Sequence, residues 1–291
     1  MGSSSLNPVF VGGTGRSGST IVGDLLDHHP AITVTIPMEV RFITGNNGIA
    51  DALAKAGKPA GLKAAELAVD RIHNRWFFRT ENVGLHTSMS REFVTETTDR
   101  YLAHFENSPQ HASQVLVYSI MEKVALGCDA ERWVDTTPAN ARKANLITPI
   151  YPEHKVIVMV RDGRDVAASF VHQDFGPSDV FEAVALWEKR MIKSDQAVKR
   201  CAAGVVLTLD LQDLVVTERD ASLDLILEHC ELEDSLEMRD WFNARVTPDG
   251  AHAGRWRRDF DDSTCAVIDK VYSDSCDRLR ELGISIPVSG E

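Results

Sequence analysis

A glycine-rich turn near the start of the chain carries the residues whose types and spacing point most directly to chemistry. It reads GGTGRSGST at positions 12–20 and follows an apolar run at 9–11. Its glycines let the backbone bend tightly and approach a ligand closely. A helix is expected to begin at the end of the turn, so backbone N–H groups would point into it at the positive end of the helix dipole. The turn therefore predicts a phosphate site, with Arg16 as its internal cation.

The turn departs at one position from the GxxxxGK[ST] pattern of kinases and ATPases. Gly13 and Gly18 have the required spacing, but Ser19 stands where the pattern needs lysine. That lysine contacts the β- and γ-phosphates, and the next hydroxyl holds Mg²⁺. We therefore expect a phosphate site without a transferable γ-phosphate and its metal. The alternative is an ordinary glycine-rich connection between a strand and a helix.

A second segment, KVIVMVRDGRDVAASF at 155–170, places further polar side chains at the end of a strand. Its apolar run is typical of a strand that is buried on both faces of a parallel sheet. Arg161 follows that run, at the edge where open α/β sheets bind ligands. Ser169 lies one helical turn beyond Asp165 and can face the same crevice. The alternative is a structural cluster of ion pairs that caps a helix, and Arg164 is expected to serve in that way.

The two segments together resemble the nucleotide-binding signatures of sulfotransferases that use 3′-phosphoadenosine 5′-phosphosulfate (PAPS). The run FVGGTGRSGSTIVGDLLDHHPAI, followed by Glu39, is similar to the N-terminal region of tyrosylprotein sulfotransferases and their bacterial relatives. The resemblance extends over residues 8–44, 131–170 and 252–286, in the order found in the family. It implies the sulfotransferase fold, an α/β domain over residues 1–291 with a P-loop-type parallel sheet flanked by helices.

The resemblance also implies a role for each matching residue. The turn would hold the 5′-phosphosulfate through Gly15, Arg16, Ser17, Gly18, Ser19 and Thr20. The 3′-phosphate would be held by Arg161 and Ser169, with Arg255 and Trp256 of the C-terminal motif nearby. Glu39 would be the catalytic base, and Arg16 would stabilise charge on the leaving group. PAPS would be the co-substrate and PAP, its desulfated form, the product; no metal is implied.

A base at position 39 is chemically reasonable. Sulfuryl transfer is an in-line displacement that depends mainly on positioning and charge stabilisation, and the acceptor hydroxyl must lose its proton as it attacks. Residues 31–37 read as a second strand, which would put Glu39 at the edge of the sheet. Burial in a dry crevice raises the pKa of a carboxylate towards neutrality. The alternative is a surface glutamate that pairs with Arg41.

One position departs from the family pattern. Members of the family often have a lysine before a Thr-Pro or Asp-Pro pair that follows a strand, but Thr136 takes that place here. Arg142 and Lys143 are candidates to replace the missing cation. The departure is also compatible with two other interpretations: a slow enzyme, or a nucleotide-binding protein without turnover.

Composition narrows the range of partners. The chain has 291 residues, a formal net charge of −12 and a pI of about 5.3, which argue against nucleic acid as a partner. Its five cysteines, at positions 128, 201, 230, 265 and 276, include no CxxC pair, so neither a disulfide framework nor a zinc site is expected. Neither a membrane-length apolar run nor a signal pattern is evident, which predicts a cytoplasmic protein without membrane contact.

The rest of the chain is expected to supply further α/β elements and an acceptor pocket. We expect a strand at 205–211 and helices at 179–200, 214–230, 234–244 and 262–282. Residues 45–130 form a helical region that would shape the acceptor site. Within it, we expect Trp76, Phe77, Phe78 and Tyr118 to pack in helix cores, and His86 and His104 to lie in solvent.

The function that fits best is O-sulfation of a hydroxyl group on a small molecule or natural product. Aromatic residues of the helical region would suit phenols or apolar acceptors, whereas Arg79 would suit an acidic one. The alternatives are a P-loop kinase of small molecules, a tyrosine-directed peptide sulfotransferase and a non-catalytic nucleotide-binding protein. The sequence does not choose among the acceptors.

Overall fold

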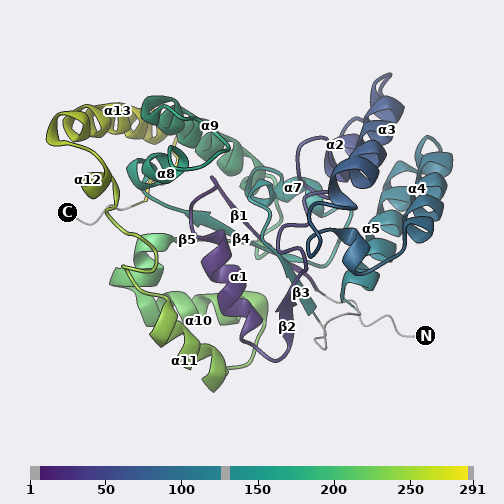
Figure 1. Cartoon of the computed structure of the whole chain (residues 1–291), viewed down its shortest axis with the longest axis horizontal. Coiled ribbons are helices and arrows are strands. Elements are labelled where there is room, and N and C mark those ends of the chain that lie inside the picture. The colour runs from purple at the N-terminus through teal and green to yellow at the C-terminus, as the bar shows by residue number, and fades with distance from the viewer. Residues whose placement is uncertain (1–6, 126–131, 288–291) are drawn as a thin grey trace.

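Five parallel strands form a sheet through the middle of the molecule (Figure 1). The structure is a computed structural model that describes residues 7–125 and 132–287. The strands are β1 (Val9–Gly13), β2 (Ile32–Val34), β3 (Arg132–Asp135), β4 (Lys155–Val160) and β5 (Val206–Asp210), in the spatial order β2-β3-β1-β4-β5. The predicted parallel sheet is confirmed. Because β1 and β4 are neighbours, the two segments that follow them meet at one edge.

Alternation along the central strand explains why both faces of the sheet are covered. Val9 and Val11 pack into one hydrophobic core, whereas Phe10 between them packs into the other. Phe10 meets Trp133 of β3 edge to face, with ring centroids 5.3 Å apart. Successive side chains of a strand point to opposite faces, so an unbroken apolar run needs helices on both.

Helices supply both cores. One core contains α1 (Ser19–Asp27), the turn η3 (Asp213–Thr217), α10 (Arg219–Cys230) and α11 (Leu236–Arg245). The other contains α6 (Ala139–Arg142), α7 (Ala144–Ile147) and the end of α9 (Val180–Val198), together with the helical region 45–125. A third cluster joins α9 to α8 (Gly163–Phe170), α12 (Trp256–Asp259) and α13 (Asp262–Glu281). Figure 1 shows this last group on the left and the helical region on the right.

The helical region beyond Gly45 is built from short and medium helices. They are α2 (Ile49–Leu53), α3 (Gly61–Arg71), the π-helical turn η1 (Ile72–Trp76), the 3-10 turn η2 (Leu85–Thr87), α4 (Arg91–Phe105) and α5 (Pro109–Ala125). Residues 126–130 of the region, and Cys128 among them, lie outside the described residues. The other four cysteines are free thiols. Among the described helices, none is long and apolar enough to span a bilayer.

The second strand is shorter than the sequence predicted. It ends at Val34, and one further bond, from Thr35 N to Val134 O (2.9 Å), extends its pairing. Pro37 has no N–H group to continue the ladder. Glu39 therefore lies five residues beyond the strand, in a loop, instead of at the strand's end. The helix after β4 begins at Gly163, where the Asp162 side chain caps it.

Two aromatic predictions for the helical region are wrong. Trp76 and Phe77 are buried as expected, but Phe78 and Tyr118 are 57% and 44% exposed. Phe78 follows the end of η1 and packs against the ring of His86, with centroids 4.7 Å apart. His86 is only half-exposed, because its ring nitrogens bond to Phe77 O and Glu81 O (3.0 and 3.1 Å).

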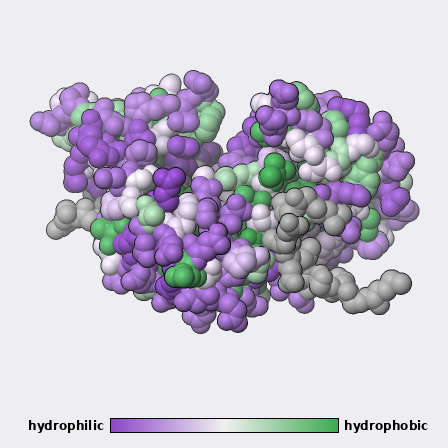
Figure 2. Space-filling model, turned by 60° about the horizontal axis from the view of Figure 1, so that its bottom comes forward, coloured by the Kyte–Doolittle hydropathy of each residue, from purple (hydrophilic) through white to green (hydrophobic). Residues whose placement is uncertain are grey.

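The surface agrees with the acidic composition. Figure 2 shows a mostly hydrophilic face with a hollow between the parts of the molecule on the left and on the right. The loops that follow the strands lie between these two parts, and they form the candidate site.

Candidate active site

The turn after β1 has the backbone of an anion-binding loop. Gly15 and Gly18 adopt left-handed conformations, with φ of 83° and 95°, and Arg16 joins them at 57°. The N–H groups of Arg16, Ser17 and Gly18 donate to none of the described residues. The Ser17 hydroxyl is also buried without a partner in that part of the chain. Unpaired donors at the start of α1 suit a phosphate or a sulfate.

Arg161 ties the turn to the end of β4. Its Nη1 donates to Arg16 O at 3.1 Å and its Nη2 to His252 O at 2.8 Å. Asp165 lies 3.4 Å from Nη2 and accepts the backbone N–H of Gly254 at 2.8 Å. Burial lowers the pKa of Arg161, while the Asp165 carboxylate opposes that shift. The predicted 3′-phosphate arginine is therefore a fixed, buried cation beside the turn.

Arg16 and Ser169 come together although 153 residues separate them. Arg16 Nε donates to Ser169 Oγ at 2.9 Å. The sequence assigned them to opposite ends of one nucleotide, the first to the phosphosulfate and the second to the 3′-phosphate. Their contact places the two predicted anion sites side by side.

One large cavity, of about 600 Å³, collects most of the predicted residues. Predicted site residues on its wall are Gly15, Arg16, Gly18, Ser19, Thr20, Glu39 and Arg161. The cavity is strongly basic. Its arginines are Arg16, Arg41, Arg71, Arg75, Arg142, Arg161 and Arg190, against one carboxylate, Glu39, among the described residues of the wall. A chain with a net charge of −12 thus concentrates cations at this one place.

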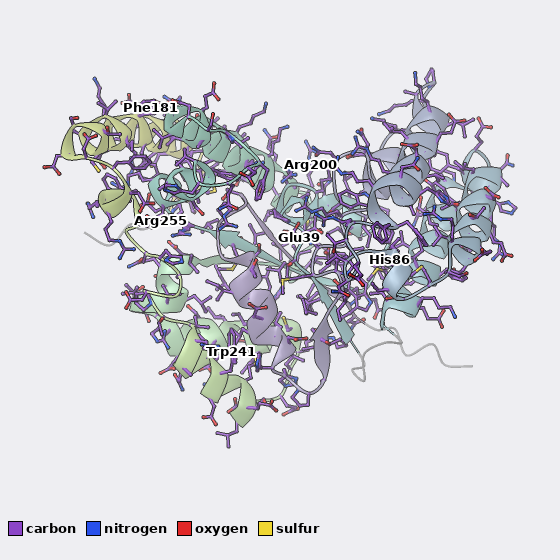
Figure 3. The ribbon with its side chains drawn as sticks, in the orientation of Figure 1. Glu39, His86, Phe181, Arg200, Trp241 and Arg255 are labelled. Atoms are coloured by element: carbon purple, nitrogen blue, oxygen red, sulfur yellow. The ribbon has the colours of Figure 1, made fainter. Side chains whose placement is uncertain are left out.

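Two residues of the C-terminal motif lie elsewhere. Arg255 donates to Asp259 Oδ2 at 2.8 Å along α12, and Figure 3 shows it on the left of the molecule, apart from Glu39. Trp256 is 4% exposed and packs its ring under the guanidinium of Arg164, 4.6 Å away. Neither lines the large cavity, so their predicted role in cofactor binding remains a prediction.

Glu39 is held in place by the end of β3. Asp135 Oδ1 accepts the N–H of Val40 at 2.9 Å, and Thr137 Oγ1 accepts the N–H of Arg41 at 3.1 Å. The Glu39 side chain is 28% exposed and pairs through Oε2 with Arg41. The structure thus contains the ion pair given as the alternative, but places it on the cavity wall instead of the outer surface.

Of the two candidates for the missing lysine, only Arg142 reaches the cavity. Thr136 donates its hydroxyl to Met38 O at 3.0 Å and supports the Glu39 loop. Lys143 pairs with Asp51 at 2.7 Å, away from the cavity wall. Arg142 lines the cavity, and its Nη1 is buried without a partner among the described residues.

Arg190 is a site residue that the sequence analysis missed. It projects from α9, bonds to Thr14 O in the turn and lies over the ring of Phe170 at 5.3 Å. Burial, with a contribution from nearby Arg142, lowers the pKa of Arg190 to about 10. Its position three residues after the buried Trp187 hinted that it faces inward, but only the fold shows that it meets the turn.

Comparison with known proteins identifies the same fold and family. A model described as the sulfotransferase family matches residues 8–236. The sulfotransferase domain of the Synechococcus PCC 7002 olefin synthase has 17% identity and a TM-score of 0.50, covering 88% of this chain and 90% of its own. The sulfotransferase domain from the curacin biosynthetic pathway has 14% identity and a TM-score of 0.52, with 97% and 99% coverage. Sulfotransferase STF9 from Mycobacterium avium has 11% identity and a TM-score of 0.51, with 98% and 79% coverage. Among curated proteins, none matches significantly.

Proposed function

The chain belongs to the sulfotransferase family, and on that premise we propose that it transfers the sulfuryl group of PAPS to a hydroxyl group of a small molecule or natural product. The observation that carries the proposal is the basic cavity of about 600 Å³ at the ends of β1 and β4, with Glu39 on its wall. This volume is within the usual range for small-molecule sites.

The donor would lie across the ends of β1 and β4. The turn offers unpaired N–H groups for the 5′-phosphosulfate. Arg161 and Ser169 would bind the 3′-phosphate, since guanidinium binds phosphate oxygens in a bidentate manner. Arg190 supports the turn from the opposite side through Thr14 O. The buried hydroxyl of Ser17, which has no partner in the described part of the chain, is a further donor that an anion in the turn could satisfy.

Glu39 would take the acceptor's proton. An oxygen–sulfur bond forms to the acceptor as the bond between sulfur and the 5′-phosphate oxygen breaks, and the leaving PAP takes the electron pair. Arg41 occupies Oε2 of Glu39, which leaves Oε1 for the proton. Arg16 and Arg190 lie on the same cavity wall as cations that stabilise the charge on the leaving phosphate.

The test is Glu39→Gln, assayed by transfer of ³⁵S-labelled sulfate from PAPS to a panel of phenols and alcohols. We expect kcat to fall by about 100-fold or more, the usual contribution of a general base, with the affinity for PAP unchanged. Glu66→Gln, an exposed glutamate on α3, is the control. An unimpaired Glu39→Gln enzyme would remove Glu39 from the role of base.

A further inference from the structure

Part of the cavity wall carries arginines that the donor does not account for. Arg71 ends α3 and Arg75 lies in η1, so both come from the helical region, whereas Arg142 ends α6. None of the three forms an ion pair within the described residues. The Asp51 carboxylate acts on Arg142 electrostatically but pairs directly with Lys143.

Two of these guanidinium groups each have one buried donor atom without a partner among the described residues. Arg71 Nε and Arg142 Nη1 are inaccessible to solvent and have no hydrogen-bond partner among the described residues. Burial also lowers the pKa of Arg142. A buried donor without a partner costs free energy, and a bound anion removes that cost. The wall is therefore in a state that a negatively charged group would stabilise.

Three arginines gather around the indole of Trp76, and Arg41, Arg75 and Trp76 itself line the cavity. The guanidinium groups of Arg41, Arg75 and Arg79 lie 5.9, 5.1 and 5.4 Å from the ring centroid of Trp76. Burial and the charges of Arg41 and Arg75 lower the pKa of Arg79, while Glu39 opposes them. Like charges this close repel one another unless an anion lies among them. Glu39 is the single carboxylate of the described cavity wall, and Arg41 already pairs with it.

The two sets of arginines come from different parts of the fold and share one cavity wall with Glu39. Arg16, Arg161 and Arg190 come from the turn after β1, the end of β4 and α9, where the donor's phosphates are proposed to bind. Arg71 and Arg75 come from the helical region. Figure 3 shows Glu39 near the middle of the molecule, between the helices on the left and the helical region on the right. An acceptor hydroxyl at Glu39 would thus have the rest of its molecule beside Arg71 and Arg75.

We propose that the acceptor is an anion: its hydroxyl lies at Glu39, and a carboxylate, phosphate or sulfate group on the same molecule binds Arg71, Arg75 and Arg142. This inference deepens the proposed function and rests on it. The planar guanidinium groups suit such oxyanions because each can donate two parallel hydrogen bonds.

Matched pairs of hydroxyl compounds test the charge directly. One pair is 4-hydroxyphenylacetate and 4-hydroxyphenylacetamide, and the other is glycerol 3-phosphate and glycerol. Binding is measured by calorimetry on the full chain, with and without saturating PAP. We expect the anionic member of at least one pair to bind about tenfold or more tightly than its neutral partner. In the double variant Arg71→Gln/Arg75→Gln we expect the two members to bind almost equally, with the affinity for PAP retained.

Controls separate this inference from the proposed function. Lys63→Gln, an exposed cation on α3, should leave the preference unchanged. Equal responses to both members of each pair, including no response to either, would overturn the inference. A preference for the anionic member that persists in Arg71→Gln/Arg75→Gln would also overturn the inference. Absence of PAP binding would contradict the proposed function instead, while the titrations without PAP would still decide whether Arg71 and Arg75 bind an anion.

Discussion

At the scale of residues, the main feature is positive charge concentrated in an acidic protein. Among the described residues, seven arginines share the wall of one cavity with a single glutamate, although the chain as a whole has a net charge of −12. Low-dielectric walls focus the field of such a cluster, which raises the local concentration of anions. A donor with an anionic group at each end can therefore enter a protein whose overall charge would repel it.

We expect Arg161 to bind the 3′-phosphate of PAP. In Arg161→Ala, we expect the affinity for PAP to fall by about 10- to 100-fold, the range for hydrogen bonds to charged groups. Adenosine 5′-phosphosulfate lacks the 3′-phosphate, so its affinity should fall much less. Calorimetry with both ligands measures the difference, and Arg200→Ala, an exposed arginine at the end of α9, is the control. Equal losses for the two ligands would contradict the assignment of Arg161.

The sequence predicts some site residues and misses others for a physical reason. Arg16 and Arg161 follow strands directly, so a linear motif identifies them. Arg71, Arg75 and Arg190 lie on helices that meet the site only through the fold, and no motif in the sequence marks them as site residues. Glu39 was found from its motif, but its partner Arg41 decides how much of the carboxylate is available.

At the scale of elements, the end of β3 positions Glu39, the proposed base. Asp135 is fully buried and accepts from Val40 N, from Thr137 N and Oγ1, and from Asn140 Nδ2, at 2.8–3.2 Å. Burial raises the pKa of Asp135, and these hydrogen bonds oppose the shift. One carboxylate thus joins the loop that carries Glu39 to the helix that carries Arg142.

Replacing the Asp135 carboxylate should affect the position of Glu39, and hence catalysis, more than it affects binding of the donor. In Asp135→Asn, the amide group of the new side chain would face hydrogen-bond donors that need an acceptor. We therefore expect the free energy of unfolding to fall by about 2–3 kcal/mol. We also expect kcat to fall while the dissociation constant for PAP stays the same. Urea denaturation, steady-state kinetics and calorimetry measure the three quantities.

Asp240→Asn, an exposed aspartate on α11, is the matched control for Asp135→Asn. If the Asp135→Asn variant is as stable as the wild type, the hydrogen bonds around Asp135 do not hold the loop that carries Glu39. Weaker PAP binding with an unchanged kcat would show that Asp135 supports binding of the donor instead of the position of Glu39.

The parallel sheet could be predicted because β1 and β4 are continuous apolar runs that end in polar turns. The loop after β2 could not, since the sequence 31–37 is apolar enough for a longer strand, and Pro37 ends the pairing before Glu39. The exposure of Phe78 and Tyr118 also depends on how the helices pack, which their local sequence does not specify.

At the scale of the whole molecule, three histidines that are at least partly buried predict how stability depends on pH. Burial is the largest cause that lowers the pKa of His73, His154 and His229 from the ordinary value of 6.5. Near pH 6.5 the unfolded chain therefore binds more protons than the folded one, and stability rises with pH. The contribution is present above pH 6.5 and is lost as the pH falls through the lower values of the folded state.

We expect the free energy of unfolding, measured in urea, to be lower at pH 5.5 than at pH 7.5. His154→Phe, which keeps an aromatic ring beside Phe10, should reduce the difference by removing one of the titrations. A stability that does not change between the two pH values would contradict the prediction.

Thermal unfolding with PAP, compared with ADP and with ATP plus Mg²⁺, tests the central claim most directly. A ligand at 100 times its dissociation constant adds about 2.7 kcal/mol of stability. We predict a clear rise in melting temperature with PAP in the absence of metal, and a smaller one with ADP, which lacks the 3′-phosphate. Stabilisation by ATP with Mg²⁺ but not by PAP would contradict the PAPS assignment and favour a small-molecule kinase.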